Sequence, residues 1–143
     1  KEIAKRYAGE GAKVCIADMN IDAGQAAADE IAAAGGVAMA VEMNVTDEAA
    51  VNAGVAATVD AYGTVDILIS NAGNQHIAPI PEQASTLGIT EAQVISDVML
   101  KDTVDGEFTT LEDIGDTAVF LAAFPSNALT GQSVVVSHGW YVE

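Results

Sequence analysis

The sequence is poor in basic residues and cysteine, and each shortage excludes a class of function. Five Lys and Arg stand against 21 Asp and Glu, which gives a formal net charge of −16. A surface this negative repels phosphate backbones and anionic lipid, so we expect neither nucleic-acid binding nor attachment to a membrane. The single cysteine, Cys15, cannot form an internal disulfide or a metal cluster, and we expect a buried, inert thiol.

Aromatic residues are also scarce, with three Phe, three Tyr and one Trp, so the core must be built from many small contacts. Hydrophobic residues nevertheless make up 50% of the chain and charged residues 18%, which is not the composition of a disordered protein. A length of 143 residues favours one domain. The longest stretch without Asp, Glu, Lys or Arg, 117–142, contains proline, serine, asparagine and histidine, and is not expected to cross a membrane.

The first part of the chain alternates predicted helices and strands. Apolar spacing indicates a helix over 1–9, a strand over 13–18, a helix from 21 to about 34 capped by Asn20, and a strand over 37–45. A third helix, capped by Thr46 or Asp47, runs to about 62, and the most apolar strand follows at 65–70. This alternation predicts a parallel sheet covered by helices on both faces.

The pattern changes after Pro81. Residues 81–103 read as polar helix broken at 87–90, and 110–124 as an amphipathic helix with acidic residues in its first turn. A tight connection over 126–131 leads to a last predicted strand over 132–137. The first residues, Lys-Glu-Ile-Ala-Lys-Arg, contain no apolar segment, so we expect no signal peptide. The chain also opens without methionine inside a helical pattern, from which we expect that a beginning is missing.

Ligands of doubly wound sheets bind at the carboxyl ends of the strands, so the residues there are the candidates for function. Asp18 ends the first predicted strand, where a carboxylate can accept hydrogen bonds from both ribose hydroxyls of an adenosine and repel a 2′-phosphate. Met19 follows instead of an arginine that could hold such a phosphate. The alternative is that Asp18 only ends the strand or caps the next helix. The small residues of 71–73 allow a backbone to approach a ligand closely, or form an ordinary turn.

Taken together, these segments resemble the short-chain dehydrogenase/reductase family. The matching pieces are 14–18, 44–47, 66–73, the helix 113–124, and the ending at 129–132 with 138–140. Within the family, 71–76, 78–80 and the terminal Gly-Trp resemble the 3-hydroxybutyrate dehydrogenases. The resemblance implies a Rossmann-like α/β fold, a doubly wound parallel sheet, and NAD-dependent interconversion of 3-hydroxybutyrate and acetoacetate in the cytoplasm.

The resemblance also implies roles for individual residues. Asp18 and Met19 would set a preference for NAD at the adenosine ribose, and Asn44, where the family usually has Asp, would border the adenine together with Val45. A second cofactor segment would lie along the nicotinamide side, and two further residues would contact a small hydroxy-acid substrate. These are Asn71, Ala72 and Gly73 for the cofactor, and Gln75 and Trp140 for the substrate. We expect structural roles for His76 and His138.

The departures from the family concern catalysis. The sequence does not encode the glycine loop that holds the cofactor's pyrophosphate, nor the first, fifth and sixth strands of the family. Before 80–81 it matches the family's region after the fourth strand, and after 80–81 it matches the substrate lid near the sixth strand, as if a central segment had been deleted. The family's catalytic tyrosine precedes a lysine by four residues, whereas Tyr7 precedes Gly11 and Tyr62 precedes Asp66 at that spacing. We therefore predict no catalytic residue and no metal ligand in these 143 residues.

Two hypotheses follow for the whole chain. Residues 1–80 are interpreted as a partial dinucleotide-binding half, and 81–143 as substrate-lid helices, a last helix and a terminal strand, within one domain. Either the chain belongs to an NAD-dependent enzyme that has further segments, or it is an inactive remnant or engineered deletion that acts only by association. Strands 13–18 and 65–70 either pair directly or leave exposed edges, and exposed edges favour a homo-oligomer.

Overall fold

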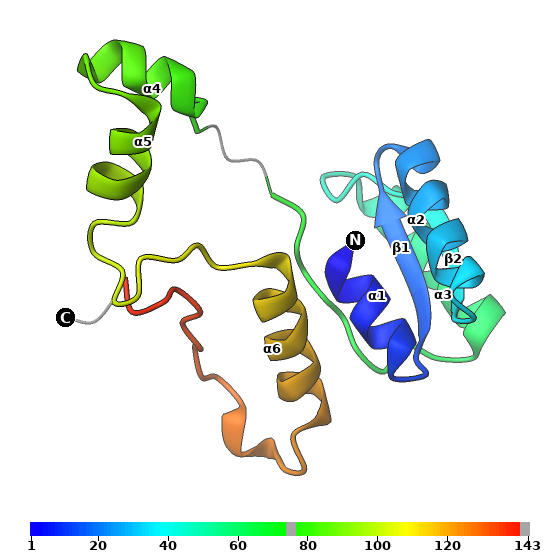
Figure 1. The fold of residues 1–143 in the computed structure, drawn as a ribbon. Coiled ribbons are helices and arrows are strands. Elements are labelled where there is room, and N and C mark those ends of the chain that lie inside the picture. Colours follow the sequence, from blue (N-terminus) through cyan, green and yellow to red (C-terminus); the bar gives the residue numbers. More distant parts are fainter. Residues whose placement is uncertain (74–76, 141–143) are drawn as a thin grey trace. The chain divides into compact units, whose positions relative to one another are not determined.

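The computed structural model describes residues 1–73 and 77–140, which form two compact units (Figure 1). The first unit comprises Lys1–Ala72 and Gly115–Pro125, and the second comprises the remaining residues from Gly73 to Ile114 and from Ser126 onward. Each unit is considered separately below.

The first unit is built on two parallel strands, β1 (Lys13–Asp18) and β2 (Val37–Glu42), paired in register from Lys13↔Val37 to Asp18↔Glu42. The same unit contains the helices α1 (Glu2–Gly9), α2 (Ile21–Ala33) and α3 (Glu48–Tyr62), together with residues 115–123 of helix α6 (Leu111–Ala123). The chain order β1, α2, β2, α3 confirms the predicted alternation of helix and strand over this region.

The helix boundaries follow from side chains that satisfy free backbone groups. The Asn20 side chain accepts a hydrogen bond from the Ala23 amide at the start of α2, as its sequence position predicts. At the start of α3, Asp47, and not Thr46, is the cap, because its carboxylate accepts the amide of Ala49. Gly63 ends α3 with a φ of 89°, a conformation that favours glycine.

Two glycines show that α2 and α3 cover opposite faces of the strand pair. A Cβ atom placed on Gly24 of α2 would lie within 4 Å of Ile16 and Ala40, which are register partners. A Cβ on Gly54 of α3 would instead meet Val41 and Met43. Since alternate residues of a strand point to opposite faces, Ala40 and Val41 lie on different faces of the sheet. The fold is therefore Rossmann-like and doubly wound, with an incomplete sheet.

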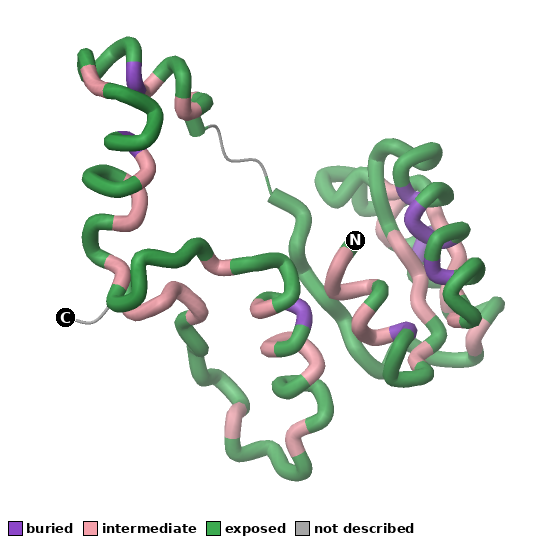
Figure 2. The backbone as a smooth tube through the Cα atoms, viewed as in Figure 1, coloured by how far each residue is buried: buried purple, intermediate pink, exposed green. Residues whose placement is uncertain are grey.

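The buried core of the first unit is small and lies mainly on α2, as Figure 2 shows. Its buried hydrophobic residues are Ala8, Ala27, Ala28 and Ile31. Alanine dominates this set, in agreement with the expectation of many small contacts. Cys15 is only half-buried, which corrects the prediction of a buried thiol, because β1 has a neighbouring strand on one side only.

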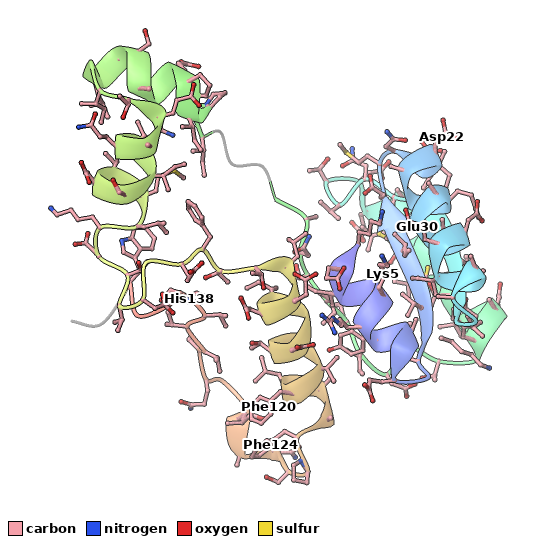
Figure 3. All side chains as sticks on the ribbon, in the orientation of Figure 1. Lys5, Asp22, Glu30, Phe120, Phe124 and His138 are labelled. Atoms are coloured by element: carbon pink, nitrogen blue, oxygen red, sulfur yellow. The ribbon has the colours of Figure 1, made fainter. Side chains whose placement is uncertain are left out.

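The basic residues of α1 and the lysine that precedes it all contact acidic side chains. Lys1 and Lys5 both reach the Glu30 carboxylate of α2, at 2.5 and 3.5 Å, and side chains of Lys5 and Glu30 are labelled in Figure 3. Arg6 contacts Glu2 and also Asp116 of helix α6 (Leu111–Ala123). The few cations therefore tie α1 to its neighbours, and they leave no basic patch on this helix.

The predicted strands over 65–70 and 132–137 are wrong. Neither segment forms a strand, and the sheet of the described residues contains β1 and β2 alone. Both segments have the β-branched, apolar composition of strands, but a strand requires a hydrogen-bonded neighbour, and neither segment finds one. Leu68 is consequently 82% exposed. Of the two alternatives for β1, direct pairing with 65–70 is not observed.

The second unit contains short helices, as the broken polar pattern predicts. Helix α4 (Ile80–Leu87) ends at Gly88, whose φ is 68°, and α5 (Glu91–Gln93) begins at a capping box between Thr90 and Gln93. A π-helix, η1 (Val94–Met99), continues α5 and buries Val94 completely. After α6, the short 3₁₀-helix η2 (Asn127–Leu129) precedes the C-terminal segment.

Candidate functional site

The carboxyl ends of β1 and β2 lie side by side and bring two predicted segments together. Asp18 is the register partner of Glu42, and the Met43 amide donates to the Asp18 carbonyl at 3.0 Å. The segments Asp18–Met19 and Asn44–Val45 therefore both leave the sheet at the carboxyl ends of the strands, where doubly wound folds bind their ligands.

The Asp18 carboxylate has one engaged oxygen and one that is open. Its Oδ1 accepts the Asn20 amide at 2.9 Å, which holds the turn into α2. The capping residue of α2 is Asn20 itself, so Asp18 ends β1 and supports the turn without being the cap, and its role at the ribose stays a prediction. Within residues 1–73 and 77–140, no donor reaches Oδ2. Asp18 is exposed, and Met19 beside it is 68% exposed.

Asn44 is shaped by its own turn. Its side-chain oxygen accepts the amide and the hydroxyl of Thr46 at 3.0 and 2.8 Å, and its carbonyl accepts the Asp47 amide. These bonds fix the loop between β2 and α3 and leave Val45 57% exposed. An exposed apolar side chain just beyond the carboxyl end of a strand suits the flat, partly apolar surface of an adenine.

Among the described parts of the chain, no contact brings the other predicted site residues to the carboxyl ends of β1 and β2. Asn71, Ala72 and Gly73 are exposed and lie in a stretch without regular secondary structure. Gln75 and His76 lie outside the described residues. Trp140 is 60% exposed and belongs to the second unit. Their roles remain predictions.

Neither described tyrosine has the surroundings of a proton donor in catalysis. The Tyr7 hydroxyl donates to the Ala118 carbonyl at 2.9 Å, and burial raises its pKa. The Tyr62 hydroxyl donates to the Val14 carbonyl at 3.4 Å; its pKa is also raised, first by burial and then by Cys15. A tyrosine that exchanges protons near neutral pH needs a lowered pKa, so both hydroxyls serve structure.

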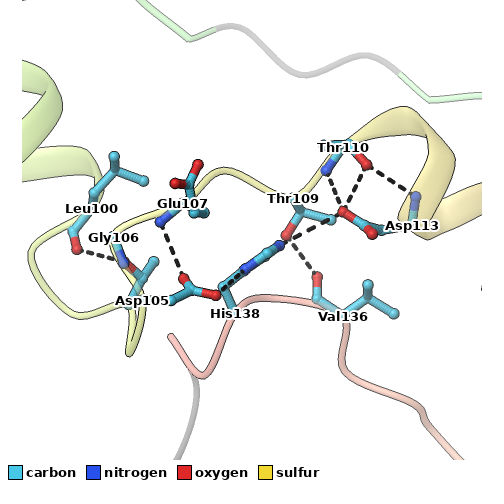
Figure 4. A network of polar contacts seen from close by, with 10 residues as sticks. Leu100, Asp105, Gly106, Glu107, Thr109, Thr110, Asp113, Val136 and His138 are labelled. Carbon is cyan, nitrogen blue, oxygen red and sulfur yellow. Dashed lines mark hydrogen bonds and ion pairs between the residues drawn. The ribbon is translucent and has the colours of Figure 1, made fainter.

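One cluster was not anticipated from the sequence. In the second unit, the His138 imidazole lies between the carboxylates of Asp105 and Asp113, which belong to separate segments of the chain (Figure 4). A signal was present, since no Lys or Arg follows Lys101, which leaves His138 as the only side chain of that region able to carry positive charge. The structural role expected for His138 is consistent with these contacts.

Within the described residues, no group of three or more His, Cys, Asp or Glu side chains is arranged to hold a metal ion. The helices of that same part of the chain are too short or too polar to cross a bilayer.

Comparison with known proteins identifies the family. The family model described as short chain dehydrogenase matches residues 1–103. Sorbitol dehydrogenase of Cereibacter sphaeroides is 43% identical over 82 residues, 57% of this chain and 31% of that protein. D-beta-hydroxybutyrate dehydrogenase of Rhizobium meliloti is 44% identical over 61 residues, 43% of this chain and 24% of that protein.

A third relative, galactitol 2-dehydrogenase of Agrobacterium fabrum, is 41% identical over 100 residues, 68% of this chain and 36% of that protein. The chain thus matches about a third of the length of such relatives. The matched region includes both strands, the residues at their carboxyl ends, and α4, α5 and η1 of the second unit. With this match over most of its length, the chain belongs to the short-chain dehydrogenase family of oxidoreductases.

Proposed function

We propose that this chain carries the adenosine-binding side of an oxidoreductase that uses NAD to interconvert 3-hydroxybutyrate and acetoacetate. Members of the family typically use NAD or NADP, which accept or donate a hydride when bound. Within that family, we propose NAD and the hydroxy acid on the basis of particular residues, and we propose a cytoplasmic location only from the family resemblance.

The observation that carries the proposal is the Asp18 carboxylate at the carboxyl end of β1. Its Oδ2 has no donor in the described chain, so it can accept a ribose hydroxyl while Oδ1 keeps its bond to the Asn20 amide. The same negative charge disfavours a 2′-phosphate, and Met19 offers no counter-charge to one. The acceptor oxygen and the charge of Asp18 therefore fit the adenosine half of NAD better than that of NADP.

The substrate proposal rests on the segment around 71–80 and on Trp140. Relatives named for sorbitol, galactitol and hydroxybutyrate are 41–44% identical over their matched regions, so overall identity does not choose among them. The Asn-Ala-Gly-Asn-Gln-His run and the terminal Gly-Trp are the features that favour a short hydroxy acid. We propose that Gln75 binds its carboxylate, that Trp140 covers it, and that Asn71, Ala72 and Gly73 line the cofactor.

Catalysis by these 143 residues alone is not expected. No tyrosine of the sequence is followed four residues later by lysine, and the hydroxyls of Tyr7 and Tyr62 are bonded to backbone carbonyls. The chain should therefore bind the adenosine portion weakly and show no NAD-linked oxidation of 3-hydroxybutyrate. A clear rate of NAD reduction that disappears when 3-hydroxybutyrate is left out of the assay would refute this part of the proposal.

Binding of NAD, followed by amide chemical shifts, tests the adenosine site. We expect NAD to perturb the amides near Asp18 and Val45, and NADP to bind at least tenfold more weakly. Asp18→Asn should weaken NAD by roughly 10- to 100-fold, the range for a hydrogen bond to a charged group. Asp29→Asn is the matched control, because it removes one charge from the exposed side of α2. Equal effects of the two variants would contradict the proposal.

A second candidate function is self-association, and the open edge of β1 favours it. The Asp18 carbonyl accepts the Met43 amide and so faces β2; by alternation, the backbone groups of Cys15 and Ala17 point to the other edge. No described residue pairs with that edge as a strand. Free strand edges pair readily with other chains.

Light scattering across a dilution and salt series tests this second function. A homo-oligomer would exceed the monomer mass of 14.6 kDa, and it would strengthen with salt because copies of net charge −16 repel one another. A mass that stays at 14.6 kDa at all concentrations and salt levels, with cooperative melting above about 60 °C, would exclude it.

A further inference from the structure

Both ring nitrogens of His138 face a carboxylate. Nδ1 lies 2.7 Å from Oδ2 of Asp105, and Nε2 lies 3.6 Å from Oδ2 of Asp113 (Figure 4). A neutral imidazole has a proton on only one of its two nitrogens, so it would turn a lone pair toward one of the two acids. The doubly protonated imidazolium is the form that matches both neighbours.

The two acids are held in place independently of His138. The Oδ1 atom of Asp105 accepts the Glu107 amide at 3.1 Å, which closes a tight turn in the loop 104–110. Asp113 is in the first turn of α6, where its Oδ2 accepts the amide and hydroxyl of Thr110 at 2.8 and 2.7 Å. The two carboxylates are thus held in position by their own segments, and the His138 imidazole bridges them.

His138 is also part of a tight turn, Ser137–Trp140, whose backbone is hydrogen-bonded to the loop 104–110. Its φ is 51°, and that of Gly139 is 81°, while the Trp140 amide donates to the Ser137 carbonyl at 2.9 Å. Two successive central residues with positive φ are typical of a type I′ turn, which disfavours most side chains at the first central position, here occupied by His138. The Val104 amide donates to the His138 carbonyl at 2.8 Å, and a Cβ on Gly139 would lie only 2.4 Å from Val104.

We propose that His138 is a proton-operated clasp: the imidazolium fastens the C-terminal turn Ser137–Trp140 to the loop 104–110 and the start of α6, and loss of its proton releases the turn. The charged groups that face the ring are Asp105 from the loop and Asp113 from the helix, and Glu107 contributes its backbone amide to Asp105. Residues 102–143 contain no Lys or Arg, so no other side chain of this segment can supply the positive charge in place of the imidazolium.

The direction of the pH response follows from these neighbours. The hydrogen bond to Asp105 raises the pKa of His138, against a smaller opposing effect of burial, and Asp113 raises it further. The pKa of Asp105 is lowered, chiefly by His138, and that of Asp113 chiefly by Thr110. A raised histidine pKa means that the clasp is complete below the ordinary value of 6.5 and is lost as pH rises through the raised value. It is also lost in strong acid, when the carboxylates are protonated.

Release changes the setting of Trp140, the only tryptophan of the chain. The clasp itself is a property of the second unit and does not depend on the proposed function. Only its consequence, a pH-dependent cover over a hydroxy-acid site, rests on that function. Spectroscopy without cofactor or substrate therefore tests the clasp separately from the enzyme activity.

The experiment follows Trp140 fluorescence and the His138 ring resonances of the full 143-residue chain from about pH 5 to about pH 9. His76→Gln assigns the resonances, because the chain has only two histidines. We expect the two readouts to share one midpoint, above 6.5. Asp105→Asn should move that midpoint to lower pH. Asp102→Asn, which removes the same charge from an exposed position nearby, should leave it in place.

Two variants at position 138 separate titration from turn geometry. His138→Gly suits the positive φ and should keep the local conformation of the turn, but the turn should be unfastened at every pH and Trp140 should lose its pH response. His138→Gln should also abolish the response. A His138 midpoint at or below 6.5, a Trp140 response that survives in His138→Gly, or equal shifts in Asp105→Asn and Asp102→Asn would each overturn the proposal.

Discussion

Replacing Ile31 by alanine should strongly destabilise the first unit and leave the stability of the second unchanged. Ile31 is 2% exposed, and the other buried hydrophobic residues described in that unit are alanines. A Cβ atom on Gly36 would lie 2.7 Å from the Ile31 side chain, which shows that isoleucine packs directly on the backbone there. Ile31 is therefore the one buried side chain in this set that is larger than a methyl group.

The magnitude follows from how little the site can close. Truncation of a buried isoleucine to alanine costs about 2–5 kcal/mol, and the cost is larger where the cavity persists. A cavity of about 80 Å³ already borders Ile31, Ala8 and Gly36, and backbone forms part of its wall. We therefore expect a loss of about 3 kcal/mol, or more than 100-fold in the folding equilibrium, which is a large part of the stability of a small unit.

Hydrogen exchange read residue by residue is the suitable assay, because it reports each unit separately. Amide protection in β1 and β2 should fall by more than about 100-fold in Ile31→Ala, while that in α4 and η1 should stay unchanged. Ile21→Ala is the matched control: it makes the same truncation on the same helix, at a residue that is 37% exposed. If the two variants lose equal protection, the assignment of the core to Ile31 is wrong.

Three further predictions concern local features of the first unit, each measured as the free energy of unfolding in urea. Gly9→Ala should stabilise by about 0.5–1 kcal/mol, because Gly9 ends α1 with no atom near its missing Cβ; no gain would contradict this. Asp47→Ala should cost about 1 kcal/mol through the lost cap on Ala49, whereas Asp47→Asn should cost less; equal losses would argue for charge instead. Tyr7→Phe should cost about 1 kcal/mol through the lost bond to Ala118, and it should leave α3 unaffected; a cost near zero would show that water replaces the hydroxyl.

Local chemistry was predictable from the sequence, and long-range pairing was not. Asn20, Asp47 and Gly63 announce helix boundaries through groups a few residues away, so the sequence alone locates α2 and α3. The run 65–70 has the residues of a strand, but a strand exists only when another strand lies beside it, and local composition does not say whether one does.

The candidate site divides in the same way. Asp18 and Asn44 were predictable as neighbours, because parallel strands of equal register end together. The approach of His138 to Asp105 spans 33 residues and depends on a turn with two positive φ values, which no pattern of hydrophobicity encodes. The absence of Lys and Arg after Lys101 was the accessible clue, and it points to charge balance instead of fold.

The unpaired run 65–70 gives a special importance to Asp66. The run is apolar, contains no proline, and leaves Leu68 82% exposed, features shared by segments that nucleate cross-β aggregates. Asp66 is its only charged residue, and stacking copies of the segment would bring these carboxylates into register and repel them. We therefore expect this single acidic side chain to limit aggregation of the segment, so that neutralising it lowers the solubility of the protein.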